Sequence, residues 1–163
     1  MAMREISYLQ AVTEAIHEEM ARDPNVFLMG EDVGLYGGAY GATRGLAAEF
    51  GDQRVFDTPI SEAGFVGLAI GAAMAGMRPV VELLFMDFAL VAADQIVNQA
   101  AKLRYMSGGQ TSVPAVFRAA LWHNTSMAAQ HSDRPYPMFM NVPGLKVVQP
   151  STPHDAKGLL LSA

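Results

Sequence analysis

The chain has 163 residues, a formal net charge of −5, 51% apolar residues and no cysteine. The lack of cysteine excludes disulfides, thiolate metal sites and thiol nucleophiles, and the apolar fraction argues against an intrinsically disordered chain. An acidic balance without a basic cluster argues against nucleic acid and anionic membrane surfaces as partners. We therefore expect a single domain over residues 1–163, in a reducing compartment such as the cytoplasm.

The sequence offers no candidate for a membrane span or a signal peptide. The longest stretch without charge, 63–77, is shorter than the about 20 residues that a membrane-spanning helix needs. Glu5 precedes any apolar run, so the N-terminus does not resemble a signal peptide. We expect 63–77 to be a buried helix.

Short apolar strands alternate with helices along the chain. Apolar residues at helical spacing predict a first helix from Ile6 to Met20, which ends at Asp23-Pro24. Strands are predicted at 26–29, 54–56, 79–84, 113–117 and 146–148, and further helices at about 46–50, 62–76 and 88–105 and from Thr152 onward. The alternation is typical of βαβ units. We expect an α/β fold with three layers, α/β/α, around a mostly parallel sheet.

The last residues, 159–163, still follow an apolar helical pattern without a cap. One interpretation is a frayed terminal helix. The other is that the chain is the N-terminal part of a longer polypeptide, which is the one we expect.

Nucleotide and metal sites of the common kinds are poorly supported. The glycine-rich loop over 30–45 lacks both Gly-x-Gly-x-x-Gly and Gly-x-x-x-x-Gly-Lys-Ser/Thr. His17 and His154 are each expected to be ordinary surface residues, and we expect no metal site. What remains is a flexible loop at the carboxyl end of a strand, where α/β proteins place ligands.

Glu62 opens a predicted helix in which Gly64, Gly67 and Gly71 are three and four residues apart. Such small residues let another backbone approach closely, inside the domain or between subunits. A carboxylate beside them also suits proton sharing, because burial raises its pKa while the helix N-terminus lowers it. The sequence leaves this balance open, and it leaves a structural and a catalytic role open for His131.

Several segments resemble a known family. Glu62 begins Glu-x4-Gly-Leu-x-x-Gly, which is similar to the pyrimidine-side motif of thiamine diphosphate enzymes. Longer segments resemble the β subunit of the decarboxylating component of 2-oxo acid dehydrogenase complexes, a pattern that pyruvate, branched-chain 2-oxo acid and acetoin dehydrogenases share. These segments are 27–34, 57–62, 71–79, 94–105, 130–132 and 143–148.

The resemblance implies a transketolase-type pyrimidine-binding domain that holds the aminopyrimidine of thiamine diphosphate. Glu62 would share a proton with a pyrimidine ring nitrogen, Phe88 would stack on that ring, and Leu84 would support the bent cofactor. His131 would assist with the intermediate or with acyl transfer to lipoamide. Glu31 would be an acid that links two active sites. Core packing, or a solvated loop position for Glu31, is the alternative for these residues.

The resemblance also implies the partners. The chain has no Gly-Asp-Gly followed by an Asn pair, the kind of motif that holds Mg²⁺ and diphosphate. These groups are therefore expected on a partner α subunit of an α2β2 heterotetramer, which would include a second β subunit and would serve a lipoyl acyltransferase core. The substrate would be a small 2-oxo acid, and the chain alone should not turn it over. The alternatives are a non-catalytic assembly domain, an acetoin dehydrogenase, or a transketolase-like enzyme.

One segment departs from the family pattern. Where the family has small residues, the stretch 119–127 contains Trp122 and His123, and Asp-Arg-Pro-Tyr-Pro at 133–137 replaces the commoner Gln-Ser-x-Glu. Both changes border the substrate side of the implied site. We expect this loop to set the preference for one 2-oxo acid over another.

Overall fold

The computed structural model describes residues 4–121 and 127–163. Its centre is a four-stranded sheet with the strand order β2-β1-β3-β4. The strands are β1 (Val26–Gly30), β2 (Val55–Asp57), β3 (Arg78–Phe85) and β4 (Val116–Ala120). All three strand pairs are parallel. The carboxyl ends of the strands therefore meet at one edge of the sheet.

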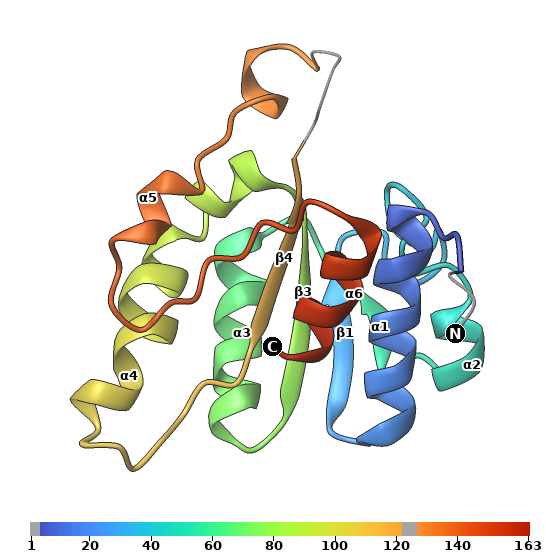
Figure 1. Cartoon of the computed structure of the whole chain (residues 1–163). Coiled ribbons are helices and arrows are strands. Elements are labelled where there is room, and N and C mark those ends of the chain that lie inside the picture. Colours follow the sequence, from blue (N-terminus) through green and yellow to red (C-terminus); the bar gives the residue numbers. More distant parts are fainter. Residues whose placement is uncertain (1–3, 122–126) are drawn as a thin grey trace.

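Helices cover both faces of this sheet (Figure 1). On one face, α1 (Tyr8–Arg22) packs against α6 (Pro153–Leu161). On the other, α3 (Glu62–Met74) packs against β3 and against the π-helical segment η2 (Gln95–Ala100), which continues into α4 (Ala101–Met106). The predicted α/β fold with three layers is confirmed.

Each face of the sheet has its own apolar core. In β3, Val81 and Leu83 belong to the core that includes Phe65 of α3, whereas Val80 belongs to the core that includes Ile16 of α1. This division follows from the alternation of side chains along a strand. Because both faces are covered, β1 is buried at all five positions, which explains its uninterrupted apolar sequence.

Helix α1 has well-defined ends. Ser7 caps it, because its side chain accepts a hydrogen bond from Gln10 N while the Gln10 side chain bonds the Ser7 N–H. At the other end, the Arg54 guanidinium donates to the carbonyls of Met20 and Asp23 at 2.8 and 2.9 Å. These bonds satisfy carbonyls that the end of a helix leaves without partners.

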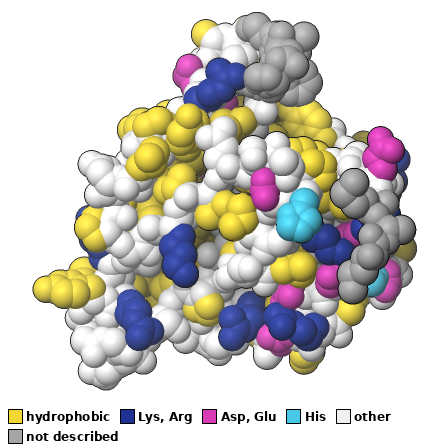
Figure 2. All heavy atoms as spheres, in the orientation of Figure 1, with side chains coloured by type: hydrophobic (Ala, Val, Ile, Leu, Met, Phe, Trp, Pro, Cys, Tyr) yellow, Lys and Arg dark blue, Asp and Glu magenta, His cyan; other side chains and the backbone are white. Residues whose placement is uncertain are grey.

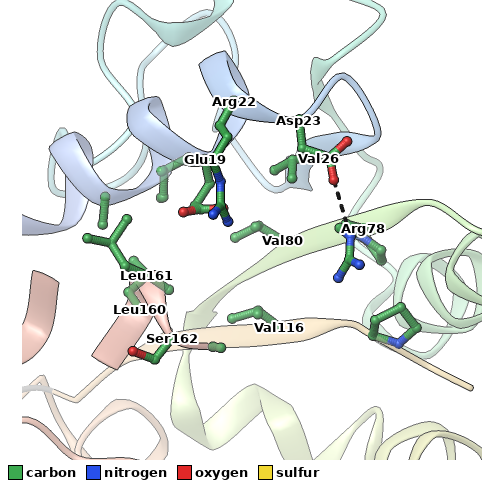
Figure 3. A pocket seen from close by; sticks show the side chains of 15 residues that line it. Glu19, Arg22, Asp23, Val26, Arg78, Val80, Val116, Leu160, Leu161 and Ser162 are labelled. Carbon is green, nitrogen blue, oxygen red and sulfur yellow. Dashed lines mark hydrogen bonds and ion pairs between the residues drawn. The ribbon is translucent and has the colours of Figure 1, made fainter. Parts of the chain in front are cut away.

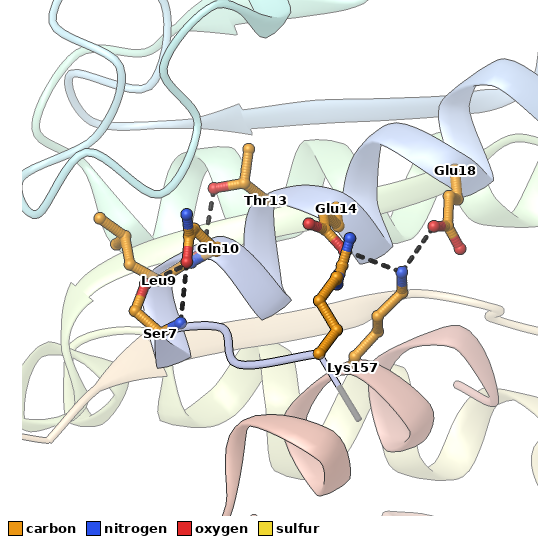
Figure 4. Close-up of polar contacts among 8 residues, drawn as sticks. Ser7, Leu9, Gln10, Thr13, Glu14, Glu18 and Lys157 are labelled. Carbon is orange, nitrogen blue, oxygen red and sulfur yellow. Dashed lines mark hydrogen bonds and ion pairs between the residues drawn. The ribbon is translucent and has the colours of Figure 1, made fainter. Parts of the chain in front are cut away.

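Charged side chains join α1 to α6. Lys157 of α6 donates to Glu14 at 3.0 Å and to Glu18 at 2.6 Å, two carboxylates one turn apart on α1 (Figure 4). Basic and acidic groups are interspersed on the face seen in Figure 2. Apolar side chains gather on its left side around α5 (Pro137–Met140), where Met138 and Met140 are exposed.

The helix predicted over 88–105 is not one continuous α-helix. It is divided into a 3-10 turn, η1 (Met86–Leu90), then η2, then α4. The Asp94 carboxylate accepts hydrogen bonds from Asn98 and Gln99, four and five residues further on. A bond at the five-residue interval fits the wider turn of a π-helix. Local apolar spacing does not encode this widening.

Two predicted strands also differ from the structure. The strand predicted at 113–117 begins later, at Val116, because Pro114 has no N–H for a ladder hydrogen bond. Residues 146–148 form no strand, and Val147 and Val148 are exposed. The short helix α2 (Leu46–Phe50) and the turn η3 (Ala129–His131) complete the described elements. Within 4–121 and 127–163, no helix is both long and apolar enough to cross a membrane.

Candidate active site

The candidate site lies where the strands of the sheet end. β1 leads directly into Glu31, and β2 leads through a short turn to Glu62 at the start of α3. β3 leads into η1, which carries Phe88, and the chain after β4 returns to η3, which carries His131. Parallel α/β sheets place ligands at this edge, so the fold gathers these residues where a site is expected.

Glu31 and Glu62 form a buried carboxyl pair. Each residue is only 7% exposed. The pKa of Glu31 is raised, first by burial and then by the negative charges of Glu62 and Asp32. Among the described residues, Glu31 Oε1 is buried and has no hydrogen-bond partner. The pair therefore offers a buried acceptor oxygen and a site that holds a proton more firmly than an ordinary glutamate does.

The backbone around Glu31 is fixed by tight local contacts. Gly30 has a φ of +155°, and a Cβ at this position would lie 2.4 Å from the Glu82 carbonyl oxygen. Only glycine fits this approach of β1 to β3. Thr58 N donates to Gly30 O at 2.9 Å, which holds the turn after β2 against the end of β1. This contact places the residues before and after the turn beside Glu31.

The helix that begins at Glu62 uses its glycines in different ways. A Cβ on Gly67 would lie 3.3 Å from Gln95 Oε1, so Gly67 serves close packing of α3 against η2. Gly64 and Gly71 lie on the exposed side of the helix. Packing inside the domain therefore accounts for Gly67, while the outer side of α3 remains open to a partner.

Three rings form a second cluster. Phe88 and His131 have ring centroids 5.3 Å apart, and Phe85 lies 5.8 Å from Phe88 and 5.1 Å from His131. All three pairs are edge-to-face, with interplanar angles between 80° and 83°. This geometry is favourable for aromatic rings and fixes the orientation of the imidazole.

The segment that carries His131 is tied to the segment that carries Phe88. Asp133 N donates to the Asp87 carboxylate at 2.9 Å, and Met127 N donates to Ser132 Oγ at 2.9 Å. The first bond ties the end of η3 to η1, and the second lies within the segment that carries His131. Trp122 and His123, which we singled out from the sequence, lie outside the described residues.

Leu84 is half-buried between Leu83 and Phe85, at an irregularity in the pairing of β3 with β4. Its inferred role as a support for the cofactor stays a prediction. Leu83 and Phe85, by contrast, are almost fully buried.

Sequence reasoning missed two aromatic residues of the cluster. Phe85 lies just beyond the strand predicted at 79–84 and was assigned no role, yet it contacts both Phe88 and His131. Tyr40 of the glycine-rich loop lies edge-on to Phe85, with centroids 6.2 Å apart. Burial raises the pKa of Tyr40. The only signal in the sequence for Tyr40 was that it is an aromatic residue in a loop at the carboxyl edge of the sheet.

A cavity lies at the opposite edge of the sheet (Figure 3). It has a volume of about 560 Å³ and is bounded by α1, the end of α6 and the amino ends of β1, β3 and β4. Charged groups on its rim pair with each other, as Arg78 and Asp23 do at 3.2 Å. None of the predicted site residues lines it. Across the described residues, no group of three or more His, Asp or Glu side chains is placed to hold a metal ion.

The fold and the site define a class of protein. It is a parallel α/β domain with buried carboxyl groups and packed aromatic rings at the carboxyl edge of the sheet, the edge where such domains commonly bind ligands. The family described as "Transketolase, pyrimidine binding domain" matches residues 4–163, and the chain belongs to that family.

Curated relatives are about 50% identical to this chain over the aligned residues. It is 52% identical to subunit beta of the pyruvate dehydrogenase E1 component of Rickettsia felis, with 98% of this chain and 49% of the relative covered. It is 51% identical to the beta subunit of acetoin:2,6-dichlorophenolindophenol oxidoreductase of Cupriavidus necator, with 98% and 50% covered. It is 50% identical to 2-oxoisovalerate dehydrogenase subunit beta of Bacillus subtilis, with 99% and 49% covered. The chain thus spans about half the length of these relatives.

A solved structure shows the same fold. It is described as a split-gene transketolase, inactive beta4 tetramer, and it superposes with a TM-score of 0.74 at 18% sequence identity. The match covers 98% of this chain and 48% of that one.

Proposed function

We propose that residues 1–163 are the pyrimidine-binding domain of a β subunit of a thiamine-diphosphate-dependent 2-oxo acid dehydrogenase. The reaction is the oxidative decarboxylation of a pyruvate-like or branched-chain 2-oxo acid, with transfer of the acyl group to lipoamide. The observation that carries the proposal is the buried Glu31–Glu62 pair at the carboxyl edge of the sheet, in a chain of this family.

Glu62 is the residue that we assign to proton exchange with a pyrimidine ring nitrogen. It is buried, and it stands at the first position of α3, beside the backbone N–H groups of the first helical turn. A carboxylate held this way accepts a hydrogen bond from a ring N–H and returns the proton as the ring requires. When bound, thiamine diphosphate supplies the electron sink for decarboxylation, and the protein supplies orientation and proton control.

Glu31 is the residue that we assign to proton storage beside Glu62. Its pKa is raised by burial and by the charge of Glu62, so Glu31 keeps its proton to a higher pH than an exposed glutamate does. Its buried Oε1, without a partner among the described residues, fits a ligand N–H or a bridging water. A chain of such acids is a path by which one active site communicates with another.

The aromatic cluster forms the apolar side of the proposed site. Phe88 is half-buried and offers a ring for stacking on the aminopyrimidine, and Leu84 supplies apolar contact for the bent cofactor. His131 is half-buried beside Phe88, where it can donate a hydrogen bond to the substrate or to the acyl group as it leaves. The segment 119–127, of which residues 122–126 lie outside the described part of the chain, is our candidate for setting substrate preference.

The surface around Glu62 supports the proposal of a partner subunit. Ile60 is 83% exposed and Leu35 is 87% exposed, and the Leu35 N–H approaches the carboxylate of Asp57, which ends β2. Large apolar residues this exposed beside a candidate site indicate a protein contact. We propose that an α subunit covers this corner and brings Mg²⁺ and the diphosphate site. The assembly also includes a second β subunit and serves a lipoyl acyltransferase core.

Acetoin cleavage is the second candidate function. The beta subunit of the Cupriavidus necator acetoin oxidoreductase is 51% identical to this chain, against 52% and 50% for the pyruvate and 2-oxoisovalerate relatives. These identities do not separate the three substrates.

The proposal is tested by co-expression of the chain with a candidate α subunit. Purified complexes are titrated with thiamine diphosphate by calorimetry, and turnover is then measured with pyruvate, 2-oxoisovalerate and acetoin. We expect saturable cofactor binding by the complex, and release of CO₂ from one of the 2-oxo acids. Turnover of acetoin alone would favour the second candidate. Cofactor binding without turnover of any of the three would favour a non-catalytic assembly domain.

A further inference from the structure

The glycine-rich loop between β1 and α2 is held together by internal hydrogen bonds. Thr43 is fully buried, and its hydroxyl donates to Val33 O at 2.7 Å while its N–H donates to Gly37 O at 2.9 Å. From outside the loop, the Thr13 hydroxyl of α1 donates to Ala42 O at 2.8 Å. These bonds tie the two arms of the loop to each other and to α1.

The close folding of this loop depends on glycine at position 37. Gly37 has a φ of +77°, and a Cβ there would lie 2.7 Å from the Arg44 Cα. The two arms of the loop therefore touch at their backbones. The residue presented between them is Tyr40.

Tyr40 packs on the ring that supports the histidine. Its ring is edge-on to Phe85 at an interplanar angle of 87°, and Phe85 is only 6% exposed. Phe85 is in turn edge-on to both His131 and Phe88. One buried ring thus contacts a loop after β1, a turn after β3 and a turn after β4.

We propose that Tyr40 is a positioning residue for His131, which acts by holding Phe85 in place. This inference rests on the proposed function, because it gives His131 a task that needs a fixed imidazole. Without the ring of Tyr40, Phe85 gains room to rotate, and the imidazole that packs on Phe85 loses its orientation. A shift of about 1 Å at a catalytic group is enough to reduce turnover substantially.

The contribution of Tyr40 comes from its ring. The contact with Phe85 is between ring edge and ring face, a geometry that phenylalanine reproduces. Burial also raises the pKa of Tyr40, so the side chain is neutral at physiological pH. Tyr40→Phe should therefore preserve the arrangement, while Tyr40→Ala and Tyr40→Leu should disturb it.

The first test reads the histidine directly. The imidazole resonances of His131 are assigned by NMR in the full chain, with His131→Gln as the reference for assignment. In Tyr40→Ala and Tyr40→Leu, we expect these resonances to lose most of the ring-current shift that Phe85 and Phe88 impose. They should be retained in Tyr40→Phe and in the control Tyr105→Ala, because Tyr105 is 90% exposed at the end of α4. Tyr40→Leu keeps an apolar side chain, so it decides the matter if Tyr40→Ala does not fold.

The second test uses the assembled enzyme. We expect Tyr40→Leu to lower kcat roughly tenfold with little change in the affinity for thiamine diphosphate, and Tyr40→Phe to restore kcat. Unchanged His131 resonances in both Tyr40→Ala and Tyr40→Leu would overturn the inference, as would an equal loss in Tyr40→Phe. If the proposed function is wrong, the NMR result still stands and no variant shows turnover, so the two failures are distinguishable.

Discussion

Buried Glu82 and half-buried Arg118 form an ion pair across β3 and β4, with 2.5 Å between Arg118 Nη2 and Glu82 Oε1. The two residues are direct neighbours in the parallel register of these strands. Burial raises the pKa of Glu82, and the charge of Arg118 and its hydrogen bond oppose that rise. Glu82 shares its side of β3 with Val80, which belongs to the core under α1. The pair therefore lies apart from the aromatic cluster of Phe85, Phe88 and His131, and its role is to stabilise the sheet.

Breaking this pair should destabilise the domain in a pH-dependent manner. We expect Arg118→Met to lower the free energy of unfolding by about 3 kcal/mol at pH 8, because it leaves Glu82 buried without a partner. The pKa of Glu82 is already raised, so it takes up a proton as the pH falls, and the penalty should be smaller at pH 5. Urea unfolding at both pH values measures this.

The double variant Arg118→Met/Glu82→Leu is the matched control for the ion pair. It replaces both charges with apolar groups and should recover most of the lost stability. A single variant as stable as the parent at pH 8 would contradict a structural role for the pair.

Two glycines provide a matched test of backbone packing. A Cβ on Gly144, which has a φ of +99°, would lie 2.0 Å from the Ala101 carbonyl oxygen of α4. We expect Gly144→Ala to lower the free energy of unfolding by about 2 kcal/mol. Gly158 lies inside α6 with no atom within 4 Å of an added Cβ, so Gly158→Ala should stabilise the chain by about 0.5 kcal/mol. Thermal unfolding measures the change in stability of both variants. If both substitutions stabilised the chain, or both destabilised it, the predicted difference in backbone packing would be refuted.

Glu31 should make the stability of the domain fall as the pH rises. Its pKa is raised in the folded chain by burial and by Glu62, so the folded state binds the proton more tightly than the unfolded state does. The stability gained from that proton is present at acid pH and is lost as the pH passes through the raised pKa. We expect Glu31→Gln, which mimics the protonated form, to become more stable than the parent as the pH increases. The measurement is the free energy of unfolding of both chains at several pH values. A difference between the two chains that stays constant from pH 4 to pH 8 would contradict the raised pKa of Glu31.

Glu62 should control turnover more than it controls cofactor affinity. In the complex with an α subunit, we expect Glu62→Gln to lower kcat by about 10²-fold or more, since it keeps the size of the side chain and removes proton exchange. The affinity for thiamine diphosphate should fall less. Steady-state kinetics and calorimetry give the two quantities. Glu49→Gln is the control, because Glu49 is exposed on α2, and full activity in Glu62→Gln would exclude the assigned role.

Much of the fold could be predicted because its signals are local. Ser7 and Gln10 are three residues apart, so the capping box that starts α1 is visible in the sequence and is present in the structure. The start of α3 at Glu62 and the apolar strands β1 and β3 were predicted to within a residue or two for the same reason. The π-helical turn at 95–100 was not predicted, because the apolar spacing of 88–105 is equally typical of an ordinary α-helix.

The candidate site was predictable only in part. Glu31, Glu62, Phe88 and His131 were selected from a family resemblance, and the order of the parallel strands places all of them at one edge. Tyr40 and Phe85 could not be selected, because nothing in a glycine-rich loop specifies which ring it will meet.

The sequence alone determined the alternation of strands and helices, the capped start of α1 and the glutamate at the start of α3, because each depends on residues within a few positions of one another. Only the tertiary structure decided that Glu82 pairs with Arg118, that Gly144 touches Ala101, and that Tyr40 reaches His131 through Phe85. The physical reason is the same in each case. These contacts join segments far apart in the chain, and their geometry is set by the order of the strands and by the packing of the segments that cover them.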